Sequence, residues 1–179
     1  HYKKIPQLWR AVFRRAKEAI ITKEFKILIT PTIRLEFRYK NGNLHILLPS
    51  GRELFYSEVK IDEVWHIMIK GKRVAMTAEI SYMGVHKNQW VRIGTHPGML
   101  VENVIQALAR DWLAYGLLCV EQAGYPVLAS VHDEVICEVP DMDKYNIDEM
   151  CKILCIKRDW AKDLPLNADG YEGYRYKKE

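Results

Sequence analysis

The sequence predicts an α+β fold, in which an antiparallel sheet and a β-hairpin pack with helices. Three features of its 179 residues lead to this prediction. Apolar residues recur at helical spacing in two segments, they alternate with polar residues between those segments, and two short apolar runs flank a charged turn near residue 132. A chain of this length can bury a substantial core. We therefore expect one domain, or one piece of a larger domain, over residues 1–179.

Composition excludes several classes of protein. Hydrophobic residues make up 49% of the chain and no segment has low complexity, which argues against disorder. No apolar run approaches the roughly 20 residues that a membrane span needs, and no secretion signal is recognisable. We expect a cytoplasmic protein without a membrane partner. The four cysteines are expected to be reduced thiols, because they form neither the C-x-x-C pairs nor the histidine spacing of a zinc site.

The first segment, residues 1–26, is expected to hold a basic amphipathic helix from Pro6 to Lys23. The net charge of +4 is unevenly distributed, because this segment carries eight lysines and arginines against two glutamates. A basic segment suits the phosphate backbone of a nucleic acid. A solvated helix face has the same composition, so both interpretations stay open.

Residues 27–98 are expected to form a β-rich meander, because apolar and charged residues alternate there with turn signals between them. The segment from Trp90 to Gly98 is expected to be a loop, since Gly94, Pro97 and Gly98 interrupt it. The histidines of this region have no metal-binding spacing and are expected to be structural or exposed. The predicted strands are Ile33–Tyr39, Leu44–Leu48, Leu54–Tyr56, Val64–Ile69 and Val74–Tyr82.

The third segment, residues 99–179, begins with the longest predicted helix, Leu100–Gln122, which is apolar nearly all round and should be largely buried. Asn103, Gln106 and Arg110 share one face of this helix. Polar groups in a buried helix must be paired or must face a ligand. A helix-to-strand polar network and a contact with the minor groove of a duplex, which presents acceptors at every base pair, both fit this spacing.

A β-hairpin is expected between Pro126 and Pro140, with His132, Asp133 and Glu134 at its tip. Because Gly124 should end the preceding helix, the polar helix face and this tip are expected to be neighbours. Two adjacent carboxylates suit Mg²⁺, which prefers oxygen ligands, although a solvated turn has the same sequence. A two-metal site needs further carboxylates from another element. A helix, Asp143–Lys157, and a surface strap, Trp160–Lys178, are expected to follow.

The run from Val101 to Pro140 resembles the palm of family A DNA polymerases, especially of their phage-encoded branch. His132-Asp133-Glu134 corresponds to the motif C triplet of that family. Leu48–Tyr56 and Asp163–Lys178 are similar to further stretches of the same branch. The resemblance covers essentially the whole chain and implies part of a polymerase palm.

The resemblance implies catalytic roles for Asp133 as a metal-binding carboxylate, for Glu134 beside it in the metal site, and for His132 near the primer terminus. Gln106 corresponds to a glutamine that touches duplex DNA in the minor groove, and Asn103 and Arg110 on the same face are further DNA-binding candidates. The implied reaction is nucleotidyl transfer from a deoxynucleoside triphosphate to a primer–template DNA, with two Mg²⁺ ions of which this chain would hold one half of the site.

The chain also departs from the family. A first carboxylate motif of the D-x-S-Q-x-E type and a fingers helix of the R-x-x-x-K-x-x-x-F-G-x-x-Y-G type are absent from these residues. His96-Pro97-Gly98-Met99 stands where the branch has an aromatic-Gly-Gly-Lys loop that contacts phosphate. We therefore expect the last third of a polymerase domain, inactive alone and completed in cis or in trans by an N-terminal polymerase part, in a bacterial or phage-infected cell.

Other origins and functions stay open at this point. The segment can be a piece of a longer protein, one product of a split gene, or a degenerate remnant. A non-catalytic DNA-binding or interaction module is the competing function. Because a sheet that lacks a palm strand exposes an apolar edge, self-association is open as well.

Overall fold

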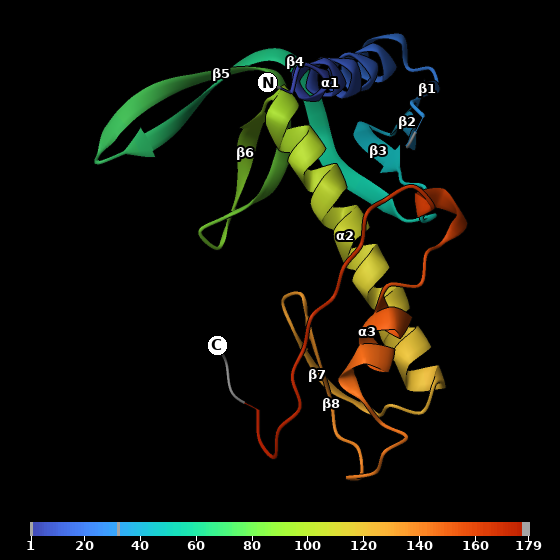
Figure 1. Cartoon of the computed structure of the whole chain (residues 1–179). Coiled ribbons are helices and arrows are strands. Elements are labelled where there is room, and N and C mark those ends of the chain that lie inside the picture. The colour runs from blue at the N-terminus through green and yellow to red at the C-terminus, as the bar shows by residue number, and fades with distance from the viewer. Residues whose placement is uncertain (1, 32, 177–179) are drawn as a thin grey trace. The chain divides into compact units, whose positions relative to one another are not determined.

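The computed structural model describes residues 2–31 and 33–176 and confirms the α+β prediction (Figure 1). Contacts divide the chain into two compact units, His1–Ala107 and Leu108–Glu179. The first unit contains a six-stranded antiparallel sheet, and the second contains a two-stranded hairpin. Among the described residues, no helix is both long enough and apolar enough to cross a membrane.

Helix α1 spans Lys4–Thr22, so it begins before the predicted start at Pro6. A proline in the first helical turn is tolerated because its missing N–H would have no partner there. The helix ends at Thr22, and the following residue, Lys23, caps it with a left-handed φ of 58°. Its inner face packs toward β1 to β4 of the sheet. That face consists of Val12, Phe13, Ala16, Ala19 and Ile20, all buried.

The sheet is a meander in which each strand pairs antiparallel with the next along the chain. Leu35 and Phe37 of one strand and Leu44 and Ile46 of the next are fully buried and form its core. Burial of each such side chain contributes about 1.5–3 kcal/mol. The strands are β1 Lys26–Ile29, β2 Arg34–Lys40, β3 Asn43–Leu47, β4 Glu53–Ile69, β5 Lys72–His86 and β6 Gln89–Thr95.

Two expectations about this sheet are wrong. Leu54–Tyr56 and Val64–Ile69 are not separate strands but parts of β4, which continues through a bulge between Ser57 and Lys60. The predicted loop Trp90–Gly98 is largely β6, because Gln89–Thr95 pairs along β5. In β4 the bulge interrupts the alternation of apolar and polar residues. In β6 a glycine, Gly94, interrupts it.

Helix α2 spans Pro97–Gln122, three residues longer at its start than predicted. The expectation that it is largely buried is wrong. Leu100, Val104 and Val120 are buried, but Ile105 and Leu118 are 51% and 61% exposed. Helix α2 therefore has apolar side chains on faces that no other part of the described chain covers.

The second unit contains β7 Val127–Val131, β8 Glu134–Cys137, α3 Ile147–Leu154 and a short 3-10 helix, η1 Asp159–Ala161. Helix α3 is shorter than the predicted Asp143–Lys157 because the side chain of Asn146 caps its start by accepting from the backbone N–H of Glu149. Val120, Tyr125 and Met150 form the small core of this unit.

Beyond η1, the described part of the tail has no regular helix or strand, as expected of a strap. Its last predicted residues, Lys177 and Lys178, lie outside the described residues. The four cysteines are half-buried and form no disulfide, and burial raises the pKa of the Cys137 and Cys151 thiols. Thiols with a raised pKa are poor nucleophiles, which fits a packing role.

Candidate functional site

The predicted acidic tip is a two-residue hairpin turn. Val131 pairs with Glu134, so His132 and Asp133 form the turn and Glu134 begins β8. All three tip residues are exposed. The expected burial of the strands beside the tip is only partial, because Leu128 of β7 is 68% exposed.

His132 has a φ of 55°, in the left-handed region. The primed turns that join two-residue hairpins require a positive φ at this first turn position. A non-glycine residue in this conformation costs roughly 1–2 kcal/mol. Seven other described non-glycine residues also have a positive φ, so this conformation marks the turn and is not by itself a sign of function. The left-handed φ of His132 could not be predicted, because His-Asp is not a usual sequence for a two-residue hairpin turn.

Glu134 has a partner that sequence reasoning missed. The hydroxyl of Tyr176 donates a hydrogen bond to Oε2 of Glu134 at 2.8 Å. This bond to a carboxylate raises the pKa of the Tyr176 phenol. The tail therefore returns to the hairpin tip within the second unit. The aromatic tail was predicted to be a strap, but no pattern in it indicates which residue it reaches.

Asp133 and Glu134 can contribute to a magnesium site but do not form a complete one. Their exposed carboxylate oxygens are the ligands that Mg²⁺ prefers, and exposure leaves room for the water molecules that this ion retains. Within residues 2–31 and 33–176, no group of three or more His, Cys, Asp and Glu side chains is arranged to hold a metal ion. The residues present fit one part of a shared site.

The polar face of α2 is not a single network. Asn103 is half-buried, and its Nδ2 donates to the hydroxyl of Tyr56 on β4 at 2.9 Å. Burial raises the pKa of the Tyr56 phenol, and the bond from Asn103 lowers it by less. Asn103 thus follows the network interpretation.

Gln106 and Arg110 are exposed, so the expectation of a buried polar face is wrong for both. Nε2 of Gln106 donates to Oε1 of Glu102 one turn earlier at 3.3 Å. Its exposed amide is available to a ligand. Asn103 and Gln106 belong to the first unit and Arg110 to the second, so the proximity of this face to the hairpin stays a prediction.

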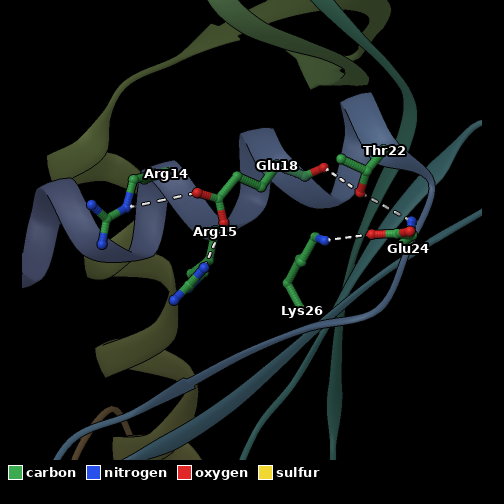
Figure 2. A network of polar contacts seen from close by, with 6 residues as sticks. All are labelled: Arg14, Arg15, Glu18, Thr22, Glu24 and Lys26. Atoms are coloured by element: carbon green, nitrogen blue, oxygen red, sulfur yellow. Dashed lines mark hydrogen bonds and ion pairs between the residues drawn. The ribbon is translucent and has the colours of Figure 1, made fainter.

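Several cations of the basic first segment are paired with nearby carboxylates (Figure 2). Nη1 of Arg15 lies 2.7 Å from Glu18, and Nε of Arg14 lies 3.9 Å from the same carboxylate. Lys26 contacts Glu24 at 2.7 Å, and this bond holds the pKa of the Glu24 carboxyl below its usual range. Neutralised cations favour the solvated-helix interpretation for this part of the surface.

Two hollows occur away from the predicted site residues. One of about 380 Å³ lies between α3 and the tail, where it is lined by residues such as Cys151, Cys155 and Asp169. The other, of about 390 Å³, lies between β4 and β5 near Asp62 and Glu79. Neither is lined by the hairpin tip or by the polar face of α2. Exposure of the three tip residues, Gln106 and Arg110 places these predicted site residues on the surface.

The chain is similar to a segment of the protein named DNA polymerase from Bacillus phage SP02, with 38% identity over 178 residues, or 99% of this chain. The chain spans 26% of the length of that polymerase. No protein-family model matches the sequence. No solved structure matches it either.

Proposed function

We propose that this chain is the C-terminal part of a template-directed DNA polymerase of family A, which adds deoxynucleotides to the 3′-end of a primer. The observation that carries the proposal is the 38% identity to a phage DNA polymerase across 99% of the chain. The exposed hairpin tip at His132-Asp133-Glu134 supports it, since this is the triplet that the motif C resemblance selects.

In this proposal Asp133 is the main carboxylate toward Mg²⁺, and Glu134 lies beside it with its Oε2 held by the Tyr176 hydroxyl. When bound, the two ions supply Lewis-acid stabilisation of the charge on the transferring phosphoryl group. His132 is assigned to the neighbourhood of the primer terminus. The turn holds His132 and Asp133 at adjacent, exposed positions on one tip.

Gln106 is assigned to duplex binding. Its exposed amide can donate to the acceptors that every base pair presents in the minor groove. Such a contact senses the shape of the duplex without reading its sequence. Arg110 is exposed one further turn along the same helix and is assigned to the phosphate backbone.

The proposal requires residues beyond these 179. A complete metal site needs carboxylates that this hairpin does not supply, and binding of the nucleotide needs the fingers helix. The chain would therefore work with an N-terminal polymerase part, in cis or in trans. Its partners would be primer–template DNA and deoxynucleoside triphosphates in a bacterial or phage-infected cell.

The test is Asp133→Ala in the complete polymerase. Loss of a group that stabilises transition-state charge costs on the order of 10²–10³-fold in rate, so primer extension should fall by at least that factor. Glu138→Ala removes an exposed carboxylate just beyond the same hairpin and should leave extension near normal. Near-normal turnover by Asp133→Ala would refute the ligand role.

One observation favours a second candidate, a non-catalytic DNA-binding or interaction module. Within the described residues no metal-holding cluster of three groups occurs. The two functions separate in the same assay, because a binding module would retain its DNA affinity and show no primer extension with any N-terminal polymerase part.

A further inference from the structure

The outer part of β4 and β5, residues 64–78, forms a two-stranded arm. Its strands pair with each other from Val64 opposite Thr77 to Ile69 opposite Lys72. Strand β3 pairs with β4 only as far as Tyr56, and β6 pairs with β5 only from Ile80 onward. Figure 1 shows the two strands projecting together beyond the rest of the sheet. Both edges of the arm are therefore unpaired.

A two-stranded ribbon is only marginally stable in water when nothing covers it. The arm also carries apolar side chains on its surface, because Val64 is 58% exposed and Met68 is 68% exposed. These two residues lie on one face of β4, since side chains two apart in a strand point the same way. The arm thus presents a face that a partner would cover.

Positive charge is concentrated at the end of the arm. Lys70, Lys72 and Arg73 are all exposed there, and no carboxylate occurs between Val64 and Ala78. Lys70 and Gly71 form the two-residue turn, with φ values of 48° and 76°. Two consecutive positive φ angles are typical of a type I′ turn, the tightest way to close a hairpin. The turn therefore places the three cations within four consecutive residues at the end of the arm.

The carboxylates nearest to the arm cannot neutralise these cations, because they are paired at its base. Lys17 of α1 contacts Asp62 at 3.4 Å and Glu79 at 3.0 Å. The hydrogen bond to Glu79 raises the pKa of Lys17, so this anchor keeps its charge at neutral pH. Glu63 contacts Lys60 at 2.6 Å and Arg92 at 3.2 Å. The base is held to α1 and β6, and the end stays cationic.

We propose that this arm binds duplex DNA, with its ribbon in the major groove and its cationic end on the phosphates. The major groove admits a two-stranded β-ribbon. Its phosphates attract clustered cations and release counterions when these bind. Val64 and Met68 supply apolar contact along the groove. The inference rests on the proposed function, which supplies the DNA; it adds a binding surface that is separate from the hairpin tip and from the polar face of α2.

The test measures how the affinity of the full chain for a fluorescent 20-base-pair duplex depends on salt. Removing three phosphate contacts with K70A/K72A/R73A should lower the slope of log affinity against log salt by about 2.7, at roughly 0.9 per contact. At 0.1 M salt this corresponds to roughly 10²–10³-fold weaker binding. An unchanged slope overturns the proposal.

Two variants control for net charge and for folding. K23A/K40A/K87A removes the same charge from exposed lysines elsewhere in the sheet unit and should change the slope little. If this variant loses as much slope, the net charge of the chain attracts DNA without a specific binding site, and the proposal is overturned. K70R/K72R keeps the charge and should retain the wild-type slope. Circular dichroism checks that each variant is folded.

Binding partners other than duplex DNA would give different results. If an acidic peptide of matched charge displaces the duplex with equal affinity per charge, the arm is a protein-binding surface and the proposal fails. If V64S/M68S abolishes self-association in sedimentation while the slope stays unchanged in K70A/K72A/R73A, the arm pairs with a second copy and the proposal also fails.

The arm and the polymerase assignment fail independently. If K70A/K72A/R73A keeps the wild-type slope while Asp133→Ala abolishes extension in the complete enzyme, only the arm inference is wrong. If the slope falls as expected while Asp133→Ala stays active, the arm binds DNA and the catalytic assignment is wrong.

Discussion

At the scale of single residues, Gly94 of β6 leaves the space that the side chain of Trp65 on β4 occupies. A Cβ atom at this position would lie 2.7 Å from Cη2 of Trp65 and 2.9 Å from Cβ of Ala78. Both distances are shorter than any ordinary carbon contact. The ring of Trp65 on β4 therefore reaches across β5 and lies directly over Gly94 of β6.

We predict that Gly94→Ala destabilises the protein. The added methyl group must displace an indole ring and a backbone-linked Cβ, and overpacking of this kind costs about 1–3 kcal/mol. Urea unfolding monitored by circular dichroism measures the effect. Gly173→Ala in the tail is the control, because its new Cβ meets nothing closer than 3.7 Å. Equal stability of Gly94→Ala and wild type would contradict the packing described here.

Residue-level prediction reached the identity of the hairpin tip but not its conformation or its partner. Asp133 and Glu134 stand out because charge rarely interrupts two apolar runs without a turn. The left-handed φ of His132 and the bond from Tyr176 depend on how the chain closes in space. Neither follows from local pattern, because the partner lies 42 positions away in the sequence.

At the scale of elements, β4 links the sheet to α2 through a buried phenol. Tyr56 is 5% exposed, accepts from Asn103, and packs edge to face on Tyr82 of β5 with ring centroids 5.0 Å apart. Burial raises the pKa of both phenols. A group whose pKa is raised on folding stabilises the native state below its unfolded pKa of about 10 and loses that contribution as pH rises through the folded value.

We predict that the free energy of unfolding falls above about pH 10 and that Tyr56→Phe reduces this fall. At neutral pH the variant loses the Asn103 hydrogen bond, worth about 0.5–1.5 kcal/mol. Chemical unfolding at pH 8 and pH 10.5 measures both effects. Tyr39→Phe, in β2 of the same sheet, should retain the alkaline loss. A wild type whose stability is constant to pH 11 would rule out the burial argument.

Element-level prediction succeeded where periodicity is uninterrupted and failed where tertiary contacts interrupt it. The alternation of β2 and the helical stripe of α1 follow directly from sequence spacing. The sequence predicts a loop at β6 because Gly94 interrupts its pattern. The glycine is required by Trp65, 29 positions earlier, whose ring lies where a Cβ would be. The exposure of Gln106 was missed because an apolar helix does not indicate which side is covered.

At the scale of the whole molecule, the chain spans 26% of the length of the phage DNA polymerase that it resembles. The related phage polymerase is about four times as long as the matched segment. Neither the first palm carboxylate motif, of the D-x-S-Q-x-E type, nor the fingers helix is recognisable among these 179 residues. The fold class and most elements follow from the sequence, whereas the completeness of the metal site stays a prediction.

We predict that residues 1–179 alone do not extend a primer. In the proposed function the hairpin supplies one part of the metal site, and the described residues contain no group of three or more His, Cys, Asp and Glu side chains arranged to hold a metal ion. A primer-extension assay with Mg²⁺ measures this directly, with the complete polymerase as the positive control. Metal-dependent incorporation by the isolated chain, lost in Asp133→Ala, would show that the site is complete after all.

The paired strands of the arm also fix how far it can reach. The six arm residues of β4, Val64–Ile69, face β5, which at about 3.3 Å per residue gives a reach of roughly 20 Å. Adding one residue to each strand would turn the cationic end to the opposite face, and adding two would restore it. The arm can therefore change length in steps of about 7 Å without losing its orientation, a coarse adjustment that leaves the sheet below it untouched.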